Sequence, residues 1–179
     1  MHFKLVGLIC LVMLCFQSCS RHAINKETVQ TLDLSRYMGK WFEIARFDHR
    51  FEHNLVGATI EYSLLPNGEI EVINSGYWGN FSGSLQKARG VAKITDPSEP
   101  GKMKICFFLR FYAEYNIMEV DEEDYNYALI GSETSDYLWL ISRTPRLPQN
   151  TIHYLLTKAK QRGYDTSMLK WVKQKEEGY

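Results

Sequence analysis

The sequence lacks an excess of charge of either sign, because its 179 residues carry 21 Lys and Arg against 21 Asp and Glu. A balanced charge argues against the basic surface with which proteins bind nucleic acids and other polyanions. Low-complexity stretches are absent, as are the G-x-S-x-G, phosphate-loop and dinucleotide-binding motifs of several enzyme classes. We therefore expect one globular domain that binds no nucleic acid, needs no cofactor and is not an enzyme.

Long hydrophobic runs are also missing, and the apolar run at residues 5–16 is too short for a transmembrane helix. Such a helix needs about 20 residues. Lys4 precedes the run and Ser18-Cys19 follow it, which is typical of a secretory signal peptide. The small Ser18 before the cysteine resembles a bacterial lipobox. We predict a lipoprotein signal peptide at residues 1–18 and a membrane anchor on acylated Cys19.

Cysteine is scarce, and three of the four cysteines lie within the first 19 residues. Once the signal peptide is removed and Cys19 is acylated, Cys106 is the only free thiol left, which excludes an intramolecular disulfide. Residues 20–31 are polar and unpatterned, so we expect residues 19–33 to be a lipidated N-terminus and tether. The folded domain is then expected at residues 34–179.

Short β-type runs separated by turn residues follow Trp41. The clearest is a hairpin in which Asn67-Gly68, a pair that favours tight turns, joins two arms. Eight strands are expected, at residues 41–47, 55–65, 69–75, 84–95, 102–107, 114–120, 125–131 and 136–142. One amphipathic helix is predicted at about 148–162, and a further short strand at 168–173. This pattern predicts an all-β fold, an eight-stranded antiparallel up-and-down barrel with one C-terminal α-helix packed outside.

Three motifs in this order resemble those of the lipocalins, in particular the bacterial outer-membrane branch related to apolipoprotein D. They are Gly39-Lys40-Trp41, then Asp124-Tyr125, then Arg143 after the eighth strand. The resemblance implies that Trp41 closes the base of the barrel and that the Arg143 guanidinium lies on its ring. It also implies a lipid-anchored outer-membrane protein that binds a fatty acid, a lysophospholipid or a similar ligand, for lipid storage, transport or membrane maintenance.

The candidate ligand-binding residues are those expected to face the barrel interior. Strand alternation assigns most of them, and comparison with the family assigns those of the sixth strand. They are Ala45, Ala58, Ile60, Tyr62, Val72, Asn74, Met103, Ile105, Phe107, Tyr115, Ile117, Ala128, Ile130, Tyr137 and Trp139. Their apolar character suits an acyl chain. Glu43 is the one carboxylate expected to face inward.

Alternatives remain open at this point. An enzyme could act on a lipid in the barrel with Glu43 as its acid, a structural lipoprotein could fill the barrel with its own side chains, and a carrier could bind a pigment or a siderophore. The sequence also leaves open whether the chain forms a homodimer. No metal site is predicted, because His49 and His53 fall in an expected loop over the barrel mouth and residues 121–124 in an expected solvated turn.

Overall fold

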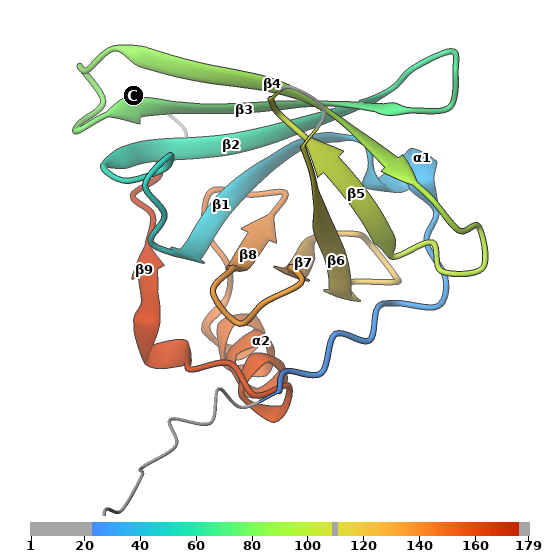
Figure 1. Cartoon of the computed structure of the whole chain (residues 1–179). Helices are drawn as coiled ribbons and strands as arrows, with labels where there is room; N and C mark the ends of the chain where they lie inside the picture. The colour runs from blue at the N-terminus through green and yellow to red at the C-terminus, as the bar shows by residue number, and fades with distance from the viewer. Residues whose placement is uncertain (1–22, 109–110, 176–179) are drawn as a thin grey trace, which may run out of the picture.

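The computed structural model describes residues 23–108 and 111–175, which form a closed antiparallel barrel (Figure 1). Its strands are β1 (Gly39–Phe47), β2 (Leu55–Leu64), β3 (Ile70–Trp78), β4 (Leu85–Ile94), β5 (Lys102–Cys106), β6 (Tyr112–Val120), β7 (Tyr127–Gly131), β8 (Leu138–Ser142) and β9 (Leu169–Trp171). The order β2-β3-β4-β5-β6-β7-β8-β1 is closed by pairing of β1 with β2, and β9 adds to the far end of β1. The predicted eight-stranded barrel and the extra strand are confirmed. The predicted signal peptide and Cys19 lie outside the described residues.

The β2–β3 hairpin shows why the strands form where the sequence predicts them. Gly68 has a φ of +82°, which glycine adopts without steric cost, and the turn is closed by hydrogen bonds between Leu65 and both Gly68 and Glu69. In β3, Ile70 and Val72 are buried while Glu71 is only partly buried, so one face of the strand packs in the core. The alternation in the sequence therefore sets the inner and outer faces of the barrel wall.

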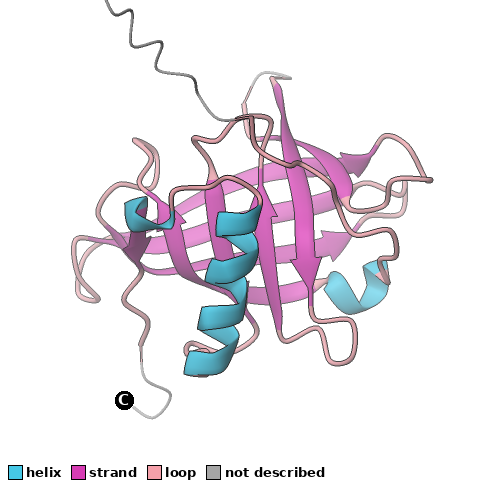
Figure 2. Cartoon of the chain, turned by 90° about the horizontal axis from the view of Figure 1, so that it is seen from below, coloured by secondary structure: helices cyan, strands magenta, loops and turns pink. Residues whose placement is uncertain are grey.

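The predicted helix is α2 (Gln149–Gln161), which lies across the outer face of the barrel (Figure 2). Its Leu155 and Ala159 are fully buried against Leu129 and Leu140, which point outward from β7 and β8. The molecule thus has two cores, one inside the barrel and one beneath the helix. A short turn, η1 (Thr166–Met168), leads from the helix to β9. Within the described ranges, no helix has both the length and the apolar character to span a bilayer.

A short helix that the sequence did not predict, α1 (Leu34–Tyr37), covers the base of the barrel. Asp33 caps it by accepting from two backbone N–H groups. The Trp41 indole N–H donates to Tyr37 O at 2.8 Å, and the Arg143 guanidinium carbon lies 3.9 Å from the centroid of the Trp41 ring. Arg143 also donates to Lys40 O at 2.9 Å. The expected cation–π closure of the base is confirmed.

The inward phase of β1 changes near Ile44, where a β-bulge shifts the register against β8. Glu43 opposes Ile141 before the bulge, and Ala45 opposes Leu140 after it. Ala45 therefore belongs to the core beneath α2, and the prediction that it faces the interior is wrong. Strict alternation fails here because a bulge adds one residue to one strand, which moves every following side chain to the other face. Arg46 faces the interior instead.

Residues 23–33, predicted to be part of a tether, lie along the barrel in the described structure. Asn25 N donates to Arg162 O and Val29 N donates to Ile117 O, both at 2.9 Å. Val29 and Leu32 also pack on the barrel core. Residues 23–33 are therefore part of the folded domain, which the sequence predicted to begin at residue 34.

We expect Trp41→Ala to lower the free energy of unfolding by about 3–5 kcal/mol, because it opens a cavity at the closed base and leaves the Arg143 guanidinium without its ring. Chemical denaturation of Trp41→Ala, Arg143→Ala and the double variant measures both losses and their coupling. Strictly additive losses would contradict a direct contact between the two side chains.

Candidate functional site: a cavity in the barrel

The barrel holds a cavity of about 550 Å³ that opens at the end opposite α1. Its wall is mainly apolar, and aromatic side chains from the β1–β2 and β5–β6 loops surround the mouth. Nine of the residues predicted to bind ligand line this cavity: Ile60, Tyr62, Val72, Asn74, Ile105, Phe107, Tyr115, Tyr137 and Trp139. Alternation along the strands therefore predicted much of the wall.

The other predicted residues lie elsewhere. Met103, Ile117, Ala128 and Ile130 are buried inside the barrel with Trp41, in the core at its base, and do not line the cavity. Their inward direction is as predicted, but side chains fill that part of the barrel. Ala58 is buried without lining the cavity.

Three tyrosines separate the cavity from the core at the base. The Tyr115 hydroxyl lies 2.5 Å from that of Tyr62 and 3.0 Å from that of Tyr37, so the three hydroxyls satisfy one another where water is excluded. Burial raises the pKa of each of the three well above its usual value, which keeps the cluster neutral. The cavity thus has a floor that is aromatic and uncharged.

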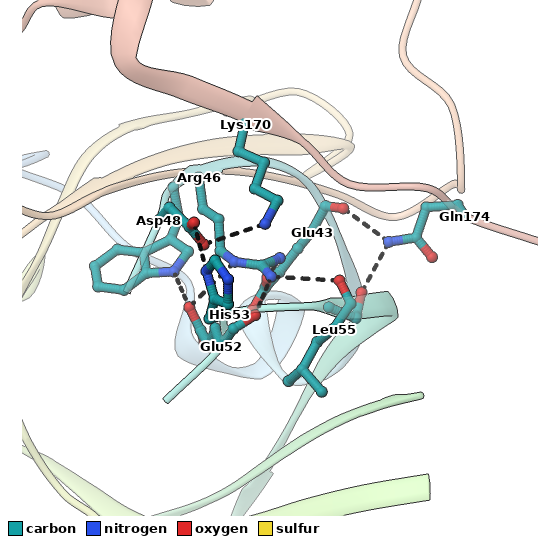
Figure 3. A network of polar contacts seen from close by, with 10 residues as sticks. Glu43, Arg46, Asp48, Glu52, His53, Leu55, Lys170 and Gln174 are labelled. Carbon is teal, nitrogen blue, oxygen red and sulfur yellow. Dashed lines mark hydrogen bonds and ion pairs between the residues drawn. The ribbon is translucent and has the colours of Figure 1, made fainter. Parts of the chain in front are cut away.

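A buried ionic triad forms one side of the wall (Figure 3). Arg46 Nη1 donates to Glu43 Oε2 at 2.9 Å, and Arg46 Nε lies 3.5 Å from Glu52 Oε2. Trp139 Nε1 donates to the same Glu52 oxygen at 3.2 Å. Both carboxyl groups line the cavity, whereas Arg46 is fully buried behind them. The two carboxyl groups thus share one guanidinium.

The charges of the triad balance only when one carboxyl is protonated. Burial and the adjacent Glu52 raise the pKa of Glu43 to about 8, although Arg46 opposes the shift. Burial also raises the pKa of Glu52, again against the effect of Arg46. At neutral pH the arrangement is one neutral acid beside one ion pair, which costs less than two buried carboxylates with a single partner.

The C-terminal segment holds this wall together from outside. Gln174 Nε2 donates to Glu43 O at 2.7 Å and to Ala58 O at 2.9 Å, and Gly57 N donates to Lys173 O. β1 and β2 pair only from Gly39 to Phe42, so these bonds connect the two strands beyond the point where they separate.

Ten lining residues were not predicted from the sequence: Phe51, Glu52, Phe108, Phe111, Ser132, Glu133, Thr134, Ala88, Ala113 and Glu114. The first seven belong to loops, where alternation gives no direction. Arg46 was missed because of the bulge, although a charged residue between apolar Ala45 and Phe47 is the signal that could have revealed it.

The other polar candidates form no metal site. His49 stacks on Tyr137 with ring centroids 4.5 Å apart, and His53 pairs with Asp48 at 2.7 Å. Burial lowers the pKa of His49, so its ring is neutral at neutral pH. No cluster of three or more metal-ligating side chains occurs in the part of the chain that the structure describes. Residues 121–124 form a turn that accepts backbone and Arg36 hydrogen bonds.

We expect the free energy of unfolding to fall as pH rises from about 5 to about 8. The native state keeps a proton on Glu43 that the unfolded chain, with a carboxyl pKa near 4.5, has lost, so deprotonation favours unfolding. The slope cannot exceed about 1.4 kcal/mol per pH unit for one proton. Glu43→Gln should flatten it, since an amide mimics the neutral acid, whereas exposed Glu61→Gln should not. Urea denaturation across this pH range measures both, and a slope that survives in Glu43→Gln would assign the proton to another group.

Comparison with known proteins identifies the family of the chain. A family model described as a lipocalin-like domain matches residues 32–174. The chain is 36% identical over 167 residues to the outer membrane lipoprotein Blc of Vibrio cholerae, covering 93% of this chain and 96% of that protein. It is 41% identical to the Escherichia coli K12 protein of the same name, over 82% and 81% of the two chains, and 37% identical to mouse apolipoprotein D, over 76% and 74%.

Solved structures show the same fold at low sequence identity. Apocrustacyanin C1 superposes with a TM-score of 0.67 at 22% identity, over 83% of each chain. Insecticyanin from the tobacco hornworm Manduca sexta superposes with a TM-score of 0.68 at 20% identity, over 85% of this chain and 86% of that one.

The names of the bacterial relatives confirm the predicted localisation, a lipid-anchored protein of the outer membrane. With a family model that matches most of its length, relatives above 30% identity and a cavity of this shape, the chain belongs to the lipocalin family and its barrel is a site for hydrophobic ligands.

Proposed function

We propose that this lipocalin binds an amphiphile with one acyl chain, a fatty acid or a lysophospholipid, and serves lipid storage, transport or maintenance at the outer membrane. The observation that supports this most directly is the cavity of about 550 Å³, which has a mainly apolar wall and is open at one end. This volume falls within the range of roughly 300–1,000 Å³ that is usual for small-molecule sites.

The wall provides enough apolar surface to hold an acyl chain. Ile60, Val72 and Ile105 line the cavity from three different strands, and Trp139 lines it from a fourth. Burying about 15 methylenes at ~0.8 kcal/mol each yields roughly 12 kcal/mol before costs. Association and ordering of the chain remove several kcal/mol, which leaves binding in the micromolar range or tighter.

The polar groups of the wall fit a head group that donates hydrogen bonds. Asn74 Oδ1 is buried without a hydrogen-bond partner among the described residues and belongs to a side chain that lines the cavity. Glu43 and Glu52 lie in the same wall. A glycerol hydroxyl or an ammonium group satisfies these acceptors, and a lysophospholipid carries both.

The residues that line the cavity support ligand binding better than they support catalysis. Ser132 is the serine among the lining residues, and its hydroxyl donates to Glu114 O at 2.9 Å. None of the described lining residues is a histidine, lysine or cysteine that could activate it. Glu43 is a neutral acid that accepts a hydrogen bond from Arg46 Nη1 inside the wall, so it acts as a fixed polar group for the ligand.

We also propose that acylated Cys19 attaches the protein to the membrane. Ser18-Cys19 after the apolar run carries this proposal, since Leu14 before Cys15 is a poor residue at a cleavage site.

We expect Ala88→Trp to block the ligand. Ala88 lines the cavity from β4, so an indole there projects into the lumen, whereas Lys87→Trp places the same indole on the outer face of the same strand. Titration with a fluorescent fatty-acid analogue and with a lysophospholipid competitor should show at least about tenfold weaker binding for Ala88→Trp, a loss of about 1.4 kcal/mol. Lys87→Trp should bind like the wild type.

Circular dichroism establishes that both variants fold. Equal affinities of the two variants would contradict the assignment of the cavity as the ligand site. Wild-type protein that shows no saturable binding of either lipid would refute the proposed function.

Cys19→Ala should abolish incorporation of labelled palmitate, because the acyl acceptor is gone. Cys15→Ala is the matched control and should be labelled normally, since that residue is removed with the signal peptide. Metabolic labelling followed by mass spectrometry of the mature N-terminus tests both. Palmitate that remains on the Cys19→Ala variant would place the anchor elsewhere.

A further inference from the structure

Exposed aromatic side chains gather at one end of the barrel. Six of them, the aromatic rim, are Phe51, Trp78, Phe107, Phe108, Phe111 and Tyr112. Trp78 pairs with Leu55 at the mouth end of the β2–β3 ladder, whereas Leu64 pairs with Ile70 at the base. Eleven large hydrophobic side chains are exposed among the described residues. At the base end of the β2–β3 ladder, Leu64 is the one that belongs to this set. The two ends of the barrel thus differ in apolar exposure.

The aromatic rim is continuous with the cavity. Phe51, Phe107, Phe108 and Phe111 line the mouth, yet Phe111 is 77% exposed, Phe108 70% and Phe51 64%. Contiguous apolar surface of this kind on a soluble protein marks a place where something else binds. Rings of Trp and Tyr beside Phe are also the composition that favours the interface between lipid and water.

The N-terminal end of the described chain lies on the mouth side. Asn25 N donates to Arg162 O at 2.9 Å, and two residues further along the chain Tyr164 packs edge-on against Phe47, with ring centroids 6.2 Å apart. Phe47 is the last residue of β1, at the end remote from α1. From there the chain runs along the barrel to α1 at the base (Figure 1).

The spacer between this point and the proposed anchor is short. Cys19 precedes Ala23 by four positions in the sequence, and a fully extended chain spans no more than about 14 Å over that length. Strand β1, with nine residues, is about 30 Å long, so the anchor reaches the mouth end and falls short of the base.

We propose that the aromatic rim docks onto the phospholipid surface that carries the lipid anchor, so that the cavity opens toward the membrane. The rim and the start of the described chain share one end of the barrel, so the anchor holds that end within reach of the bilayer. An acyl chain then passes from bilayer to cavity along the Phe side chains with little exposure to water. The orientation rests on acylation of Cys19 in the proposed function and is independent of which ligand the cavity takes.

The test uses the acylated full-length mature protein, reconstituted into vesicles of phosphatidylethanolamine and phosphatidylglycerol that contain brominated phosphatidylcholine. Phe111→Trp places a fluorophore in the aromatic rim, and Leu64→Trp places a matched one in an exposed apolar position at the base. After subtraction of the wild-type signal, bromine should quench the added fluorescence of Phe111→Trp severalfold more than that of Leu64→Trp.

Equal quenching of the two variants, stronger quenching of Leu64→Trp, or quenching of neither would overturn the proposal. Binding of a fluorescent fatty-acid analogue is measured on the same proteins without vesicles. If the rim docks but the protein binds no ligand, this proposal stands and the proposed function is refuted. If the protein binds ligand but the rim does not dock, the proposed function stands and this proposal is refuted.

Discussion

A β-bulge near Ile44 inserts one extra residue into β1. The side chains after the bulge therefore point to the opposite face of the sheet from the one that strict alternation predicts. Before the bulge, Trp41 and Glu43 point inward, where they close the base and line the cavity. After it, Ala45 and Phe47 pack beneath α2 and Arg46 turns into the barrel. One strand thereby serves the inner core, the outer core and the polar wall.

Burying the triad of Arg46, Glu43 and Glu52 costs free energy of desolvation, which its contacts partly offset. A guanidinium removed from water needs carboxylate or carbonyl partners for its N–H groups. Arg46 donates from Nη1 to Glu43 and from Nη2 to the backbone oxygen of Glu52, while its Nε lies 3.5 Å from Glu52 Oε2 without a hydrogen bond. Trp139 donates to that same oxygen of Glu52. The loop that carries Glu52 is thereby tied to β1 and β8. Two polar groups of the wall are consequently held in fixed positions on an otherwise apolar surface.

The sequence predicted the fold well because its signals are local. Alternating residues, Asn67-Gly68 and the amphipathic stretch at 149–161 each determine structure over a few residues, and the motif residues Trp41 and Arg143 meet as the resemblance implies. The cavity was predicted less fully, because its depth depends on packing between distant strands. Met103 and Ile130 face inward as expected, yet whether such residues meet ligand or one another is decided by the tyrosine floor. Phe108 and Phe111 belong to a loop, where no periodicity fixes a direction.

The contribution of residues 173–174 to the seam between β1 and β2 has a consequence for the order of folding. Gly57 N, Glu43 O and Ala58 O find their partners in the last residues that the structure describes, and β1 also pairs with β9. Contacts between chain segments so far apart in sequence form late and slowly. Strands β1 to β8 are complete once Ser142 has been made, whereas the seam lacks these bonds until residues 173 and 174 follow. During synthesis, therefore, the seam between β1 and β2 is the last part of the wall to acquire its hydrogen bonds.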